Sequence, residues 1–271
     1  MSTSPASSAT PAPLVRDYAD SAVVIAGGTS GVGLASALGF VDAGVRRLAL
    51  LARNPERGAA AREAVLARCP DAQVHFIATD ADDLAQVQAS VEAAHTALGT
   101  IDVLVNSMTS TYRPELLHRT PLEDVAGILT RQALPPMHMT RVVLPIMQAQ
   151  GGGSIVNVAS DAAKVATPGE SVLGAAMAAI VMFTRVAAIE AKRNGVRVNV
   201  LTPSLIAGTP TAENVLRDGF SKALFEKAAG LAHLGVAEPE DLANLVVFLG
   251  GPGSARLTGQ AISVNGGISA A

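Results

Sequence analysis

A glycine-rich turn between an apolar strand and a helix constrains the fold of this chain most strongly. The strand Ser21–Gly27 reads S-A-V-V-I-A-G, and G-T-S-G-V-G leads from it into a helix predicted over Val32–Ala43. Glycine lets the backbone approach a phosphate closely, and the helix start offers free N–H groups with a partial positive charge. The order strand, turn, helix predicts a dinucleotide site. The structural alternative is a tight turn with no ligand.

Composition limits the kind of protein this can be. The chain has 271 residues, of which 49% are hydrophobic, so a single large domain with a sizeable core is expected over residues 17–271. Strands alternate with helices, which predicts an α/β doubly wound parallel sheet. The first 16 residues are rich in Ser, Pro and Ala and are predicted to form a disordered tail.

Charge and apolar patterning indicate the partners and the compartment. A net charge of -3 gives no basis for binding nucleic acid or an anionic membrane. The apolar runs are broken by Gly, Pro and charged residues, so no membrane span is predicted. The single cysteine, Cys69, excludes an internal disulfide and suits a reducing cytoplasm. We therefore expect a cytoplasmic protein with a small-molecule substrate.

The end of the second predicted strand, Arg47–Leu51, indicates which nucleotide is preferred. It lies about twenty residues beyond the glycine turn, where an acidic residue would hydrogen-bond a free ribose 2′-hydroxyl. This chain has Ala52 and Arg53 there. Arg53 can pair with a 2′-phosphate, which favours NADP(H) over NAD(H). The alternative is a solvated arginine at a helix start.

Two further motifs carry a family resemblance. Gly27, Gly31 and Gly33 fit the spacing G-x-x-x-G-x-G, and the strand Ile155–Ala159 ends in Ser160. Together they resemble the short-chain dehydrogenase/reductase (SDR) family, and the resemblance runs over nearly the whole chain. It implies a Rossmann-type sheet of about seven strands with helices on both faces. It also implies subunit pairing through the helix expected over Val172–Ala191 and the helix around Val142.

The resemblance fails at the residues that carry the family's chemistry. The family has a tyrosine thirteen residues after the serine, and a lysine four residues later. These positions are Leu173 and Met177 here, and the usual asparagine of the preceding helix is Gln132. In the family the tyrosine gives a proton, while the lysine lowers its pKa and holds the nicotinamide ribose. Of the four catalytic positions, only Ser160 is kept.

The resemblance also implies which residues contact the cofactor. Asp80 is expected near the adenine, although it is also a candidate cap for the helix Asp83–Leu98. Asn106 is the first residue of the family's N-N-A-G, here followed by the bulkier Met108 and Thr109. No metal site is expected. The predicted cofactor residues are Gly27, Thr29, Ser30, Gly31, Val32, Gly33, Arg53, Asp80, Asn106, Pro203 and Thr209.

Other side chains are candidates for the missing proton donor. Each has a surface or packing role as its alternative. They are Asp161, Lys164, Glu170 and Ser171 near the serine, and Tyr112 and His138 on other segments. Pro135 and Pro136 are expected to kink or break the helix predicted over Leu122–Gln150. Residues Ala212–Leu231 are expected to form a helical region on the substrate side.

Three functions remain open from the sequence. The first is an SDR-type NADP(H)-dependent oxidoreductase that acts on a carbonyl or activated double bond with a non-standard active site. The second is a catalytically inactive subunit or cofactor-binding partner of an active homologue. The third is a non-redox hydrolase or lyase that kept the fold, since fold does not dictate function. A homo-oligomer, dimer or tetramer, or a hetero-oligomer with another SDR protein is expected.

Overall fold

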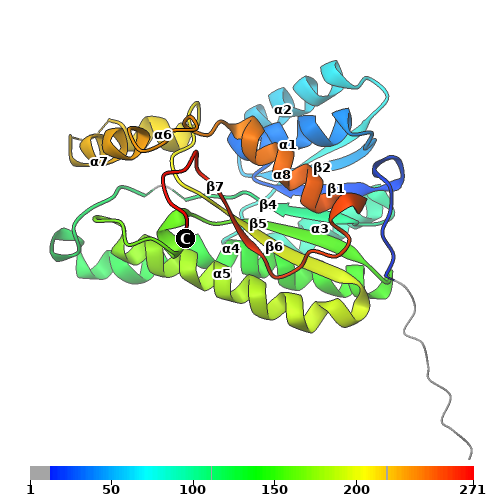
Figure 1. Ribbon diagram of the computed structural model, residues 1–271. Coiled ribbons are helices and arrows are strands. Elements are labelled where there is room, and N and C mark those ends of the chain that lie inside the picture. The colour runs from blue at the N-terminus through cyan, green and yellow to red at the C-terminus, as the bar shows by residue number, and fades with distance from the viewer. Residues whose placement is uncertain (1–12, 111, 218) are drawn as a thin grey trace, which may run out of the picture.

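The computed structural model describes residues 13–110, 112–217 and 219–271. It confirms the predicted single α/β domain with a sheet of seven parallel strands, ordered β3-β2-β1-β4-β5-β6-β7 (Figure 1). The strands are β1 Ala22–Ala26, β2 Arg47–Ala52, β3 Gln73–Ala78, β4 Val103–Asn106, β5 Gly153–Val158, β6 Val196–Pro203 and β7 Ala261–Val264.

Eight α-helices connect the strands. They are α1 Gly31–Asp42, α2 Pro55–Arg68, α3 Leu84–Leu98, α4 Leu122–Ala149, α5 Ser171–Ala191, α6 Pro210–Val215, α7 Gly219–Ala229 and α8 Pro239–Gly250. Short 3-10 turns lie at Tyr18–Asp20, Leu117–Arg119, Asp161–Ala163, Lys192–Asn194 and Pro252–Ser254. The helical region expected over Ala212–Leu231 corresponds to α6 and α7.

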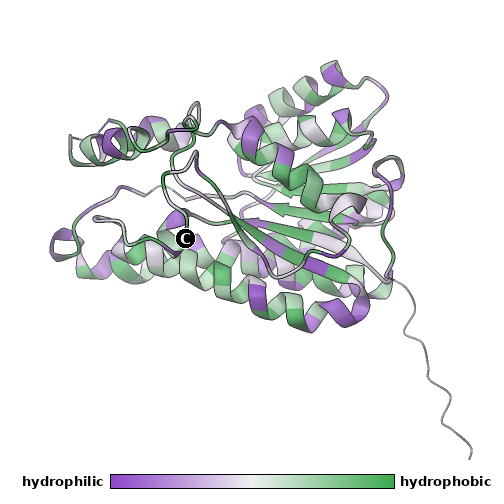
Figure 2. Cartoon of the chain, viewed as in Figure 1, coloured by the Kyte–Doolittle hydropathy of each residue, from purple (hydrophilic) through white to green (hydrophobic). Residues whose placement is uncertain are grey.

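The sheet is covered on both faces. Buried residues of α1, α2 and α8 form one core with the strands, and those of α3, α4 and α5 form another (Figure 1). Figure 2 shows hydrophobic residues along the strands and a mixture of hydrophobic and hydrophilic residues along the helices. Every residue of β1 is buried, as expected for a parallel sheet covered on both sides.

The strand order determines where a ligand crevice is expected. After β1 the chain runs to β2 and β3 on one side, and then returns to β4 on the other. At such a switch point the connections diverge beyond the carboxyl ends of the strands, and this opening is where ligands bind. Ala26 of β1 pairs with Asn106 of β4, which brings the glycine turn beside the loop after β4.

Two predictions about helix geometry are wrong. The helix α4 is not broken at Pro135 and Pro136, because both prolines are buried and the helix is held by packing of its inner face, including Met139. A kink at these prolines stays a prediction. Asp80 does not cap α3. The cap is Asp83, whose Oδ1 accepts the N–H groups of Ala85 at 2.9 Å and Gln86 at 3.2 Å.

Residues 1–12 of the predicted tail lie outside the described residues. Two residues from the described part of the predicted tail, residues 13–16, contact the domain. The Leu14 N–H donates to the Gly151 carbonyl at 3.0 Å, and Arg16 Nε pairs with Asp102 Oδ1 at 2.9 Å.

One helical segment, residues 171–194, is long and apolar enough to cross a membrane by length and composition. It lies against the sheet with α4 beside it, and Ala187, Ala188 and Ala191 are buried in the core. These contacts are those of a core helix in a folded domain.

Candidate nucleotide and catalytic site

The glycine turn is packed tightly against the loop after β4. A β-carbon on Gly33 would overlap the carbonyl oxygen of Gly27, and one on Gly27 would lie 2.7 Å from the carbonyl oxygen of Ser107. Gly27 also has φ +85°, in the left-handed region that favours glycine. The missing side chains therefore let β1, the turn and the β4 loop meet at one point.

The start of α1 fits the pyrophosphate of a dinucleotide. Ser30 is the N-cap, and its side chain accepts no bond from the helix, so the first N–H groups of α1 have no side-chain partner. Such N–H groups and the helix dipole attract phosphate. Thr29, Gly31 and Val32 surround this position in the sequence, and they would hold the phosphates through their backbone.

Thr209 borders the turn from the far side of the crevice. A β-carbon on Gly31 would lie 3.5 Å from Thr209 Cγ2. The Thr209 hydroxyl donates to the Ile206 carbonyl at 2.9 Å and accepts the Ala212 N–H at 3.1 Å, so it caps α6. Pro203 ends β6 and starts this segment. A contact of Thr209 with the nicotinamide amide stays a prediction.

The ribose end of the site holds the predicted discriminating residues. Arg53 is exposed directly after β2, and it makes none of the ion pairs found among the described residues. Asp80 is partly exposed after β3, and its Oδ1 accepts the Asp82 N–H at 3.1 Å. Both lie at the carboxyl ends of neighbouring strands.

Asn106 takes part in a buried polar chain, and its predicted contact with the cofactor stays a prediction. It is buried, and its Nδ2 donates to Asn157 Oδ1 at 2.8 Å. Asn157 Nδ2 in turn donates to Thr184 Oγ1 at 2.9 Å, so a buried polar chain links β4, β5 and α5. The sequence analysis missed Asn157 and Thr184, although an asparagine within an apolar strand is itself a signal of an internal polar contact.

Ser160 is placed for hydrogen bonding at the end of β5. Its Oγ accepts the Ala162 N–H at 3.2 Å, which leaves the hydroxyl proton available to a ligand. The next residue, Asp161, is buried, and its Oδ2 accepts from Asn265 Nδ2 at 3.0 Å and from Ser269 Oγ.

Lys164 points to the C-terminal segment as well. Its Nζ donates to Ser263 Oγ and to the Ala271 carbonyl oxygen, both at 2.6 Å. Asp161 Oδ2 and Lys164 Nζ therefore tie the chain end to the Ser160 loop, while the buried Asp161 Oδ1 has no hydrogen-bond partner among the described residues.

Leu173 and Met177 fill the positions of the missing pair with apolar packing. Met177 is 7% exposed and belongs to a small cluster with Ala159, Ile180, Val181 and Val200. Leu173 packs against the same cluster and is partly exposed. Because Ala159 directly precedes Ser160, this cluster forms an apolar wall beside the serine.

Four other residues that the sequence analysis singled out have different surroundings in the structure. Gln132 is buried, and its Nε2 donates to the Ser110 carbonyl at 3.2 Å, which holds the loop after β4. His138 Nδ1 is buried without a hydrogen-bond partner among the described residues, and Ser171 is exposed. Met108 packs on the core beneath α3 and α4.

Tyr112 and Glu170 lie close together under α7. The Tyr112 hydroxyl donates to the Gly169 carbonyl at 2.6 Å. Burial, together with the nearby negative charge of Glu170, raises the pKa of Tyr112 to about 12. Burial raises the pKa of Glu170 to about 7, so this carboxyl group is the one that titrates near neutral pH.

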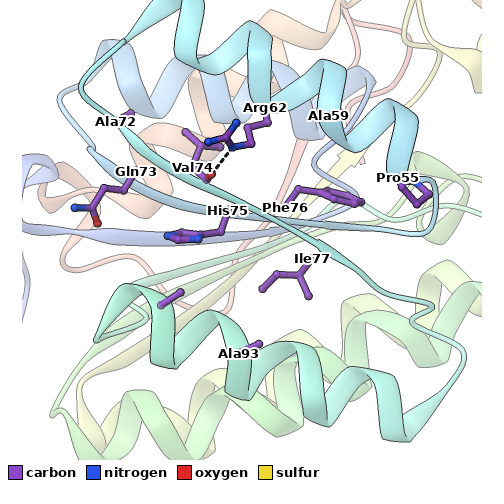
Figure 3. A pocket seen from close by; sticks show the side chains of 11 residues that line it. Pro55, Ala59, Arg62, Ala72, Gln73, Val74, His75, Phe76, Ile77 and Ala93 are labelled. Atoms are coloured by element: carbon purple, nitrogen blue, oxygen red, sulfur yellow. Dashed lines mark hydrogen bonds between the residues drawn. The ribbon is translucent and has the colours of Figure 1, made fainter.

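A separate surface hollow lies outside the edge strand β3, between α2 and α3 (Figure 3). Its lining includes Pro55, Phe76 and Ala93, and none of the predicted site residues. Arg62 Nε donates to the Val74 carbonyl at 2.9 Å within it. The hollow is the open side of the sheet edge rather than part of the site at the switch point.

Comparison with known proteins agrees with this geometry. A family model described as enoyl-(acyl carrier protein) reductase matches residues 26–269. The chain belongs to the short-chain dehydrogenase/reductase family. SDR proteins are oxidoreductases that bind NAD(P)(H), typically act on small molecules and are often oligomers.

Relatives with similar sequences span the same domain. An uncharacterised oxidoreductase of Mycobacterium tuberculosis is 32% identical over 253 residues, which cover 92% of each chain. A 3-oxoacyl-[acyl-carrier-protein] reductase of Chlamydia pneumoniae is 31% identical over 91% of this chain and 96% of its own.

Solved structures superpose closely. Levodione reductase has a TM-score of 0.86 and 29% identity, over 92% of this chain and 97% of its own. A short-chain oxidoreductase of Pseudomonas aeruginosa PAO1, described as containing an atypical catalytic centre, was solved with NADPH bound. It has a TM-score of 0.84 and 30% identity, over 94% of this chain and 99% of its own.

Restoring the family's lysine at position 177 should destabilise the folded protein. In Met177→Lys an ammonium group would replace a thioether inside the apolar cluster. We expect the free energy of unfolding to fall by about 2–5 kcal/mol in urea denaturation. The matched control is Ala64→Lys at an exposed position on α2, where the expected change is below about 0.5 kcal/mol. Equal stability of the two variants would contradict the apolar wall.

Proposed function

We propose that this protein is an NADP(H)-dependent oxidoreductase that acts on a carbonyl or activated double bond of a small molecule through a non-standard active site. The observation that carries the proposal is the contrast between its two halves. The nucleotide half keeps the glycine turn and the open start of α1. The catalytic half keeps Ser160 and replaces the tyrosine and lysine with Leu173 and Met177. The Pseudomonas aeruginosa relative, described as both NADPH-bound and atypical, supports this combination.

The preference for NADP(H) rests on Arg53. Its guanidinium is exposed at the end of β2, where a 2′-phosphate would lie, and planar bidentate donors suit phosphate oxygens. Related structures hold either nucleotide, since a 3-ketoacyl reductase of Brucella melitensis was solved with NADH. The choice therefore depends on this chain's own residues.

The reaction would divide between the cofactor and the cleft. When bound, the nicotinamide supplies or accepts the hydride. The Ser160 hydroxyl would donate a hydrogen bond to the substrate oxygen, where negative charge develops. Leu173 and Met177 would exclude water from that oxygen, which strengthens the hydrogen bond. Neither can donate a proton, so another group must do so.

The second candidate, a catalytically inactive partner subunit, is favoured by one observation. Besides the lost pair, Lys164 donates to Ser263 and to the Ala271 carbonyl oxygen, so the lysine nearest to Ser160 in the sequence is engaged with the C-terminal segment. Such a subunit would still bind nucleotide. Turnover of a carbonyl panel by the isolated protein separates the two candidates.

Nucleotide affinity tests the cofactor proposal directly. We expect NADPH to bind more tightly than NADH in a fluorescence titration. Arg53→Ala should weaken NADPH binding about 10- to 100-fold, because a charged hydrogen bond contributes about 1.5–3 kcal/mol, and should leave NADH binding nearly unchanged. The control is Arg185→Ala on the exposed side of α5. Equal loss for both nucleotides, or no loss for either, would contradict the assignment of Arg53.

We also propose that copies of the chain associate through the outer side of α5. Met182, Val186 and Ile189 are 57%, 48% and 59% exposed and lie one helical turn apart, so they form an apolar stripe.

Light scattering at micromolar concentration should give a multiple of the 27.5 kDa chain mass. Val186→Asp combined with Ile189→Asp should reduce it to the monomer by placing charge on the stripe. Leu234→Asp, at an exposed position away from α5, is the control. A wild-type monomer would end this proposal.

A further inference from the structure

Glu170 is a buried acid without a partner. It is 9% exposed at the start of α5, where it occupies the N-cap position without a side-chain cap bond. Among the described residues, its carboxyl group has neither a hydrogen bond nor an ion pair. Burying a carboxyl group in this way costs free energy, so its retention calls for a partner that the chain does not supply.

Glu170 directly precedes α5, three residues before Leu173, which occupies the position of the family's tyrosine. Residues 170, 173 and 177 are spaced three and four apart, which places them on one side of the helix. Leu173 and Met177 on that side face the wall that includes Ala159, next to Ser160. Glu170 lies about 4.5 Å further along the helix axis than Leu173, at the N-terminal end of α5.

Three segments meet at Gly169, next to Glu170. The Glu115 N–H donates to the Gly169 carbonyl at 2.8 Å, and Tyr112 donates to the same oxygen. From α7, Phe220 packs on Gly169, and Ser221 Oγ donates to the Pro114 carbonyl at 3.4 Å. These contacts hold the corner of the chain that carries Glu170, and its side chain is left 9% exposed.

We propose that Glu170 is the catalytic acid–base residue of this protein, in place of the tyrosine that Leu173 replaces. This inference rests on the proposed oxidoreductase function. In carbonyl reduction, the carbon accepts a hydride and its two electrons while the oxygen takes the proton of the Glu170 carboxyl group. The carbonyl is reduced to an alcohol, the cofactor is oxidised, and the Glu170 carboxylate regains a proton from water. Alcohol oxidation runs in reverse.

The titration behaviour of the neighbouring groups agrees with this assignment. Burial raises the pKa of Glu170 to about 7, which suits proton transfer in both directions near neutral pH. The rival donor, Tyr112, has its pKa raised to about 12, and its proton is bound to the Gly169 carbonyl. Tyr112 is therefore a positioning residue that holds the Gly169–Glu170 corner.

The groups around Glu170 do not lower its raised pKa. From the loop after β4 they are Tyr112 and Glu115, which carry no positive charge, while Arg113 between them is exposed and makes none of the ion pairs found among the described residues. From α7 they are Phe220 and Ser221, which do not titrate in this range. Lys164 in the Ser160 loop is bound to Ser263 and the chain end.

Stability gives a readout that needs no substrate. The pKa of Glu170 is higher in the folded chain than its ordinary 4.5, so the folded state holds the proton more tightly. Its contribution to stability is full below pH 4.5 and is lost as pH rises through about 7. Glu170→Gln stays neutral, so its Tm relative to the wild type should rise across this range. Glu63→Gln, at an exposed position on α2, should follow the wild type at every pH.

Kinetics tests the chemical role. With a carbonyl that the wild type reduces with NADPH, Glu170→Gln should lower kcat about 100-fold or more, with NADPH binding within about twofold. The wild-type kcat for reduction should fall as pH rises above about 7, and this limb should vanish in Glu170→Gln. Glu170→Asp should restore part of the rate together with the limb, and Glu63→Gln should match the wild type.

The possible outcomes distinguish a failure of the Glu170 assignment from a failure of the proposed oxidoreductase function. If Glu170→Gln keeps kcat within threefold and keeps the pH limb, Glu170 is not the acid, while the oxidoreductase function stands. A Tm difference from the wild type that does not change with pH also overturns the assignment. If the wild type binds NADPH but reduces no carbonyl, the proposed function fails and this role fails with it.

Discussion

The contact between the glycine turn and the loop after β4 is the constraint on which the rest of the site depends. Gly33 approaches Gly27 so closely that no β-carbon fits, and Gly27 meets the Ser107 carbonyl in the same way. This contact fixes the start of α1 at the switch point of the sheet. The first N–H groups of α1 and Thr209 lie beside this contact, and β5, which leads to Ser160, pairs with β4 next to it.

The two halves of the cleft differ in how closely they follow the SDR pattern. The nucleotide half retains the features that a dinucleotide needs, including the uncapped start of α1. The catalytic half has exchanged a tyrosine and a lysine for an apolar wall of Leu173 and Met177. A buried carboxyl group, Glu170, lies one helical turn away and has a pKa of about 7. Burial raises the pKa of this carboxyl group, which allows it to act as a proton donor near neutral pH.

Much of this could be predicted from the sequence because it is local. Alternating strands and helices gave the doubly wound sheet, and residue spacing from Ser160 placed Leu173 and Met177. The continuity of α4 through Pro135 and Pro136 was not predictable, because burial against other elements outweighs the lost hydrogen bonds. The contacts of Lys164 could not be predicted from the sequence either, because its partners lie 99 and 107 residues further along the chain. Glu170 was one of several candidates, and only its tertiary enclosure distinguishes it.

Isotope transfer tests the central claim most directly. NADPH carrying deuterium at the transferable position of the nicotinamide would be mixed with the purified wild-type protein and a panel of carbonyl compounds. The products would then be analysed by mass spectrometry and NMR. The account predicts one deuterium on the carbinol carbon of a product alcohol. NADPH that binds tightly yet delivers no deuterium to any compound would contradict it, and would identify the chain as a nucleotide-binding subunit without redox activity of its own.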